Sequence, residues 1–122
     1  MSNNSSMFVP VGQNIFDLNS ITNIEYVIKN IQVYVKNNPN GIVITNEEYQ
    51  QLINYIFSHQ HKLRNEEIPK YVLVGKNMFN TDTITHVMYN NGQVLVFINN
   101  NPNGMPISKD EYQLLIKYLL AG

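Results

Sequence analysis

Apolar side chains in this chain follow two spacings, and each spacing occurs more than once. From Ile21 to Ile28 and from Ile31 to Val35, β-branched and aromatic residues recur as they do in strands. From Tyr49 to Ile56, apolar residues fall at i, i+3, i+4 and i+7, which is one face of a helix. The pattern therefore predicts strands followed by a helix that covers them.

The second half of the chain repeats this pattern. Shifted by sixty-three residues, Val11 to Ile56 aligns without a gap with Val74 to Leu119 and is identical at twenty of forty-six positions. A fixed-period repeat indicates structural units that bury their apolar faces against each other. We predict an α+β fold: a tandem repeat of two β-rich units in one compact domain. Each unit consists of antiparallel strands closed by one C-terminal helix, and a pseudo-twofold relates the two.

The boundaries follow from the repeat and from a polar stretch between its copies. We expect a flexible N-terminus over 1–7, a first unit over 8–57, a connector over 58–70 and a second unit over 71–122. Short strands open the units at Phe8 to Val11 and Tyr71 to Val74. A turn with an anchoring phenylalanine should follow each of them.

Turns and helix starts are marked by short motifs. Asn37-Asn-Pro-Asn-Gly41 and its copy at 100–104 predict hairpin tips with a left-handed glycine, and Asn90-Asn91-Gly92 predicts a tight hairpin. Thr45-x-x-Glu48 and Ser108-x-x-Glu111 are capping boxes. The neighbouring acidic pairs are therefore interpreted as helix caps and not as an acid/base couple.

The two units differ on the outer face of the sheet. Inward positions are apolar in both. The opposite face carries Gln32, Tyr34 and Lys36 in the first unit, and Leu95, Phe97 and Asn99 in the second. An apolar second face is covered either by the other copy, as core, or by a second subunit or partner protein. The candidate interface residues are Met88, Leu95, Phe97, Leu114 and Leu120.

Charge and composition narrow the functional classes. The 122 residues carry eight Lys plus Arg and nine Asp plus Glu, a net charge of −1, which supplies no long-range attraction to polyanions. The chain has no cysteine and no recognisable leader or membrane-spanning run, so we expect a cytoplasmic protein with no membrane partner. Abundant Asn, Ile, Lys and Tyr are typical of phages, viruses and low-GC bacteria.

Catalytic chemistry is not indicated. The histidines His59, His61 and His86 lie in no nucleophile motif, so we predict no enzyme, no catalytic residue and no cofactor. His59 and His61 in a polar connector are more often solvated than metal-bound, and the segment 99–110 lacks the early carboxylates of a calcium loop. We predict no metal site.

The segment Gly41-Ile-Val-Ile-Thr-Asn-Glu-Glu-Tyr-Gln-Gln-Leu-Ile-Asn-Tyr-Ile56, repeated at 104–119, resembles the closing strand and helix of the PC4 and PUR-alpha group. This resemblance implies single-stranded DNA or RNA binding, with bases stacked on strand aromatics beside basic residues. The residues that it would use are Lys29, Tyr34, Lys36 and Phe97. Strands 84–98 contain no Lys or Arg, which reduces the electrostatic contribution.

These observations predict a non-enzymatic module that binds a macromolecule. The preferred hypothesis is a protein-binding regulator, inhibitor or assembly factor of phage, viral or low-GC bacterial type that forms homo-oligomers. The alternative is the single-stranded nucleic-acid binder. A third hypothesis is a protein that sequesters a small ligand at the junction of the two units.

Overall fold

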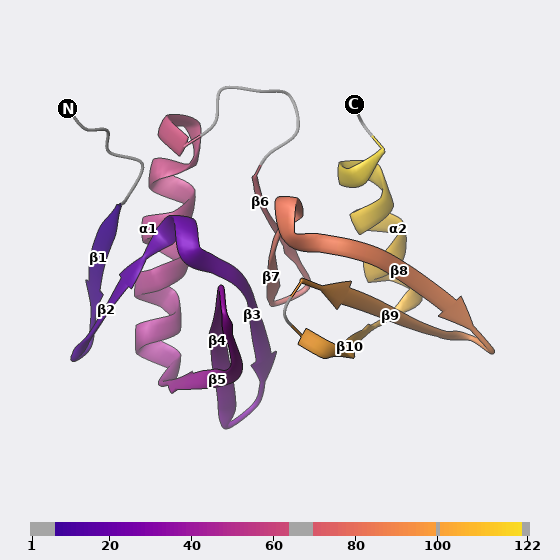
Figure 1. Ribbon diagram of the computed structural model, residues 1–122, viewed down its shortest axis with the longest axis horizontal. Coiled ribbons are helices and arrows are strands. Elements are labelled where there is room, and N and C mark those ends of the chain that lie inside the picture. The colour runs from indigo at the N-terminus through magenta and orange to yellow at the C-terminus, as the bar shows by residue number, and fades with distance from the viewer. Residues whose placement is uncertain (1–6, 64–69, 100, 121–122) are drawn as a thin grey trace.

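The computed structural model describes residues 7–63, 70–99 and 101–120, and it has the predicted α+β class. Figure 1 shows two helices packed against strongly bent antiparallel strands. The elements are β1 (Phe8–Val11), β2 (Asn14–Asp17), η1 (Leu18–Ser20), β3 (Ile21–Val27), β4 (Asn30–Val35), β5 (Asn38–Ile44), α1 (Asn46–Leu63), β6 (Tyr71–Val74), β7 (Asn77–Asn80), η2 (Thr81–Thr83), β8 (Ile84–Asn90), β9 (Gln93–Ile98), β10 (Asn101–Ile107) and α2 (Lys109–Leu119).

The strands form three sheets. A two-stranded sheet pairs β1 with β2, a five-stranded sheet has the order β5-β4-β3-β7-β6, and a three-stranded sheet has the order β10-β9-β8. The central sheet therefore contains strands from both halves of the chain. They meet where β3 pairs with β7, through Asn23↔Phe79 and Ile24↔Met78.

The same order of elements occurs twice along the chain, but the pairing between the halves is one-sided. A twofold axis would pair β2 with β8 as β7 pairs with β3. No such pair occurs among the described strands, so the predicted pseudo-twofold is not confirmed. The hairpin β6–β7 extends the sheet of the first half, whereas β1–β2 stands as a separate sheet.

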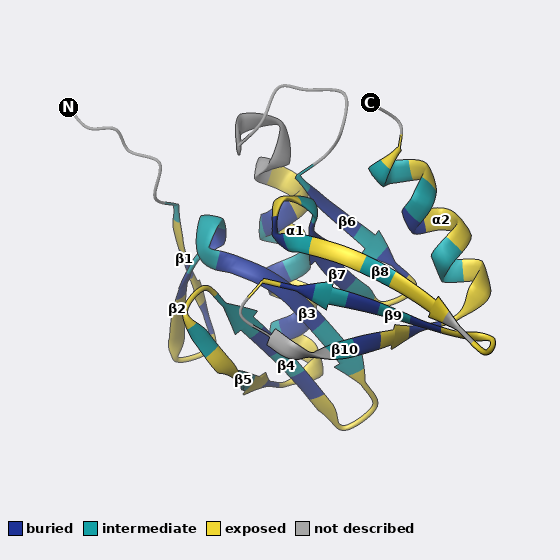
Figure 2. Ribbon diagram, turned by 45° about the vertical axis from the view of Figure 1, so that its right-hand side comes forward, coloured by how far each residue is buried: buried dark blue, intermediate teal, exposed yellow. Residues whose placement is uncertain are grey.

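Two apolar cores lie on either side of the central sheet. One contains Leu18, Ile24 and Val33 together with Leu52 and Ile56 of α1, and the other joins β6, β7, β9 and β10 to α2. The inward residues Ile31, Val33, Val94, Val96 and Ile98 are buried, as their period-two spacing predicts. Figure 2 shows this burial as dark blue segments along the middle of the strands.

The turns differ from the predictions at one motif. The Asn91–Gly92 hairpin is confirmed, with positive φ at both residues, as a primed two-residue turn requires. The Asn37 to Gly41 motif was wrongly predicted as a tip, because β5 already begins at Asn38 and Gly41 does not adopt a positive φ. The left-handed residue is Asn37 (φ 66°), and the bend lies at Lys36–Asn37. Asparagine tolerates this conformation because its side chain is short and polar.

The strands β2 and β7 were missed, because Gly12 and Gly75 suggested loops. Both glycines do adopt a positive φ, and a Cβ at either one would collide with the carboxylate of Glu48 or Glu111. The chain then returns as a strand, so that each turn is a hairpin. Phe16 and Phe79 are buried anchors, as predicted.

Both helix starts are capping boxes, as predicted. Thr45 Oγ1 accepts from the Glu48 backbone N–H at 3.1 Å, and Glu48 Oε1 accepts from the Thr45 N–H at 2.9 Å. Ser108 and Glu111 form the same pair at 3.1 and 2.8 Å. These bonds satisfy backbone donors that the first helical turn leaves free.

The predicted connector is partly helical, because α1 continues through 58–63. Residues 64–69 of the predicted connector 58–70, and residues 1–6 of the expected flexible segment 1–7, lie outside the described residues. Met7, at the end of that segment, donates its N–H to Asp17 Oδ1 at 3.1 Å. Neither described helix is long and apolar enough to span a bilayer.

Candidate nucleic-acid interface

Two groups of tyrosine and lysine side chains lie where the long hairpins end and the helices begin. The first tip cluster consists of Tyr26 on β3, Lys29 in the β3–β4 turn, Asn46 and Tyr49 at the start of α1, and Lys76 in the β6–β7 turn. Lys29 is an exposed residue in the turn that ends this hairpin, and it has a positive φ (70°).

The ring of Tyr26 is the centre of this cluster. It packs edge-on against Tyr49 with ring centroids 4.8 Å apart, and Lys76 Nζ lies 4.9 Å from its centroid on the face of the ring. Its hydroxyl donates to Asn46 Oδ1 at 3.2 Å. Three separate segments of the chain are therefore held around one ring.

Tyr49 also holds the β6–β7 turn in place. Its hydroxyl donates to the Lys76 carbonyl at 2.6 Å. Burial, together with the nearby Tyr26, raises the pKa of Tyr49 to about 12. Tyr49 is therefore a neutral donor that positions Lys76.

A groove opens beside the first tip cluster. It has a volume of about 490 Å³ and lies between the end of the β3–β4 hairpin and the start of α1. Its lining joins the aliphatic side chains of Ile28, Ile31 and Ile44 to the polar residues Tyr26, Lys29, Asn30, Thr45 and Asn46. A cation, hydroxyls and amides thus face the same space, and these groups bind phosphate and base edges.

The second half carries a smaller version, the second tip cluster of Tyr89, Lys109 and Tyr112. The rings of Tyr89 and Tyr112 lie 5.6 Å apart, and Lys109 Nζ lies 5.9 Å from the Tyr89 centroid. Here the lysine comes from the first turn of α2 and not from a neighbouring hairpin. Each long hairpin therefore ends beside a tyrosine pair with a lysine over one ring.

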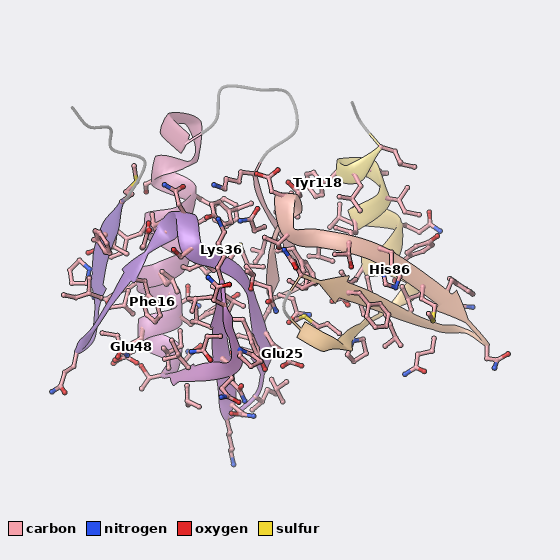
Figure 3. All side chains as sticks on the ribbon, viewed as in Figure 1. Phe16, Glu25, Lys36, Glu48, His86 and Tyr118 are labelled. Carbon is pink, nitrogen blue, oxygen red and sulfur yellow. The ribbon has the colours of Figure 1, made fainter. Side chains whose placement is uncertain are left out.

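The structure separates the residues predicted to contact nucleic acid. Lys29 and Lys36 lie at opposite ends of β4, about 20 Å apart at strand rise. Figure 3 shows Lys36 and Glu25 on different parts of the first half. Tyr34 lies between these lysines and donates its hydroxyl to Gln32 Oε1 at 3.0 Å. Burial and the nearby Glu25 carboxylate raise its pKa.

Phe97 lies on the separate three-stranded sheet, where His86 stacks on it at 4.4 Å between centroids and 8° between planes. One face of this ring is already occupied. The four predicted residues therefore form no single patch, and only Lys29 belongs to a tip cluster.

The candidate interface residues divide between two places. Met88, Leu95 and Phe97 share the outer face of the three-stranded sheet, where Met88 pairs with Leu95 across the strands. Met88 is exposed, and Leu95 and Phe97 are half-buried. Leu114 and Leu120 are exposed on and just after α2, which packs on the opposite face of that sheet.

Every member of the tip clusters except Lys29 escaped the sequence-based prediction. These residues are Tyr26, Asn46, Tyr49, Lys76, Tyr89, Lys109 and Tyr112. The repeat contained a signal for the four tyrosines, since tyrosine occupies both 26 and 89 and both 49 and 112. Lys76 could not be found in this way, because it reaches the cluster through the β3–β7 pairing.

Side chains of His59 and His61 lie outside the described part of the structure. Among the described residues, no group of three or more His, Asp or Glu side chains is arranged to hold a metal ion.

Comparison with known proteins gives one structural likeness. No protein-family model matches the sequence, and no curated protein matches it. Among solved structures, the chain is similar to the LytTr DNA-binding domain of a response regulator from Bacillus cereus. The TM-score is 0.56 at 11% identity, and the match covers 97% of this chain and 99% of that domain. The chain therefore shares the fold of that domain over nearly its whole length.

This finding corrects the preferred functional hypothesis. The prediction of a protein-binding regulator, inhibitor or assembly factor is wrong, because the solved domain with this fold is a DNA-binding domain and the nucleic-acid alternative agrees better with it. The prediction came from the apolar outer face at Leu95 and Phe97, and an apolar face does not identify its partner. The resemblance to PC4 and PUR-alpha units stays a prediction.

Proposed function

We propose that this chain is a non-enzymatic DNA-binding domain that contacts duplex DNA through its two tip clusters. The observation that carries the proposal is the end-to-end likeness to a DNA-binding domain. The tip clusters add the chemistry, because lysine binds phosphate as a point charge and asparagine can read adenine. We further propose that the two halves arose as a tandem repeat, which would account for the two tyrosine pairs.

Duplex DNA fits the aromatic residues better than single strands do. Single-strand binders stack bases on open aromatic faces. Here Tyr26 has Lys76 on its face, Phe97 has His86, and Tyr34 is half-buried with a bonded hydroxyl. Contacts from Lys29, Lys76 and Lys109 to a phosphate backbone need no free ring.

The test is fluorescence anisotropy with a labelled duplex of random sequence, repeated over a salt series. We expect binding at low salt with a shallow dependence, because each phosphate contact contributes a slope of about −0.9. With three lysines engaged, the slope of log K against log salt is about −3. Tighter binding of the matching single strand would overturn the choice of duplex.

Substituting the lysines by alanine tests where the protein contacts DNA. The double substitution Lys29→Ala and Lys76→Ala should make the salt slope shallower by about 2. Lys36→Ala is the matched control, because Lys36 is an exposed lysine at the other end of β4 and was also a sequence candidate. An equal loss from Lys36→Ala would move the contact from the tips to the opposite end of the hairpin.

A further inference from the structure

The hairpins β1–β2 and β6–β7 have the same register and the same inner face. Val11 pairs with Asn14 as Val74 pairs with Asn77. The side chains facing the core of their own half are buried in both: Val9, Val11 and Phe16 in one, Val72, Val74 and Phe79 in the other.

Their outer faces differ completely in exposure. On β6–β7, Tyr71 and Met78 are both 0% exposed, because this face packs on the first half of the molecule. The equivalent residues on β1–β2 are Phe8, 66% exposed, and Ile15, 71% exposed, with the exposed Pro10 paired to Ile15. An apolar face that is buried in one hairpin is thus bare in the other.

The surface that covers β6–β7 is built from β3 and α1. Ile21, Ile24 and Ile56 are fully buried there. Several hydrogen bonds cross the junction. Among them, the Tyr26 N–H donates to Asn77 Oδ1 at 2.8 Å, and the Tyr49 hydroxyl donates to the Lys76 carbonyl.

The second half presents the equivalent surface without a cover. Ile84, Val87 and Leu119 replace Ile21, Ile24 and Ile56, and they are only partly buried. β8 is an outer strand of its sheet, so one side of it is open for pairing among the described strands. Figure 2 shows β8 as a largely exposed strand on the front of the molecule.

Some of the hydrogen-bonding residues of the internal junction are also repeated at the equivalent positions. Tyr89 and Tyr112 stand where the first half has Tyr26 and Tyr49, and Asn14 stands where β7 has Asn77. The residues that form the bond from the Tyr26 N–H to Asn77 are therefore repeated as Tyr89 and Asn14. The second half thus presents the same type of donor, beside partly buried apolar residues, that holds β6–β7 in the first half.

We propose that copies of this chain associate head to tail, with the β1–β2 hairpin of one copy adding to β8 and α2 of the next. The contact repeats the junction that already joins the two halves inside one chain, with Ile15 taking the place of Met78 beside Val87. Such a contact joins two different surfaces, so a pair of copies still has one free hairpin and one free β8, to which further copies can add. Added strands gain affinity from main-chain hydrogen bonds and specificity from side-chain pockets.

The contact between chains is weaker than the internal junction. Phe8 lacks the hydroxyl with which Tyr71 donates to the Leu18 carbonyl. Asp17 replaces Asn80, whose amide donates to the Ile21 carbonyl at 3.1 Å. Association is therefore reversible and rises with concentration.

Sedimentation velocity over a concentration series tests the proposal, with the full chain in each case. We expect the average mass to rise with concentration. Ile15→Asp should hold the protein as a monomer, because it places a charge in the contact. Val43→Asp is the control, since Val43 is an exposed apolar residue on β5, a strand that belongs to neither surface.

Val87→Pro disables the other surface. In β3 the Tyr26 N–H points toward β7, and Ile24, two residues earlier, has the same orientation. Val87, the counterpart of Ile24, should therefore direct its N–H to the open edge, where proline is tolerated but cannot donate. Circular dichroism checks that both variants remain folded.

Mixing the two variants gives the decisive result. Each variant alone is a monomer, but an equal mixture should form a dimer and nothing larger, because one intact hairpin meets one intact β8. A wild-type chain that stays monomeric at every concentration overturns the proposal. So does a mixture that remains monomeric, or an Ile15→Asp variant that associates as the wild type does.

Discussion

The hairpins β1–β2 and β6–β7 show how one sequence pattern acquires two environments. Both hairpins carry apolar residues on each of their two faces. Both turn at a glycine with positive φ that lies beside a helix cap. The second is sealed between two cores, whereas the first covers only one. An apolar face therefore indicates a contact, while the neighbouring elements decide whether that contact lies inside the chain.

The largest expected difference between the hairpins is in stability. Met78→Ala should lower the free energy of unfolding by about 2–5 kcal/mol, because it leaves a cavity between buried residues. Ile15→Ala, at the equivalent position, should change it by less than about 0.5 kcal/mol in dilute protein, where the side chain is solvated. Urea denaturation measures both values. Equal losses would mean that the two hairpins are buried alike.

Alkaline pH should destabilise the junction that holds the β6–β7 hairpin, to which Tyr49 donates a hydrogen bond. The pKa of Tyr49 is raised from 10.0 to about 12, so above pH 10 the unfolded chain loses this proton while the folded chain retains it. The stability contribution is therefore complete below pH 10 and is lost as the pH rises toward 12. Burial also raises the pKa of Tyr71, which acts in the same direction.

Denaturation at pH 9, 10 and 11 checks this dependence. Tyr49→Phe should reduce the slope of stability against pH, because the variant has no proton to lose at this site. An unchanged slope would show that Tyr49 is not responsible.

The smallest expected effects are at the two helix starts, which serve as an internal control. Thr45→Ala and Ser108→Ala should each cost about 1 kcal/mol, since each removes one side-chain acceptor from a complete capping box. Thermal melts of both variants measure the cost. Values that differ by more than about 1 kcal/mol would show that the halves differ here also.

Local features of the fold were readable from the sequence because their signals are local. The capping boxes, the Asn91–Gly92 turn and the inward faces of β4 and β9 depend on residues a few positions apart. The strand β7 was missed because Gly75 suggested a loop, although its hairpin with β6 is local. Its pairing with β3 was also not predicted, because β3 is more than fifty residues away and no nearby pattern encodes that pairing.

The candidate site was only partly predictable for the same reason. Lys29 was identified as a basic residue close in sequence to the strand aromatic Tyr34, which is a local property. Lys76 lies over Tyr26 only because the halves share a sheet. The predicted partner Lys36 lies at the far end of β4, a separation that follows from strand length once the true turn at Lys36–Asn37 is known.

Nuclear magnetic resonance titration of the protein with duplex DNA would show directly whether the tip clusters contact DNA. We expect backbone amide shifts to move at the β3–β4 turn around Lys29, at the β6–β7 turn around Lys76 and at the start of α2 around Lys109. Only small changes are expected on the outer face of the three-stranded sheet, at Leu95 and its neighbours Met88 and Phe97. Shifts confined to that outer face, or no shifts at low salt, would contradict DNA binding through the tip clusters.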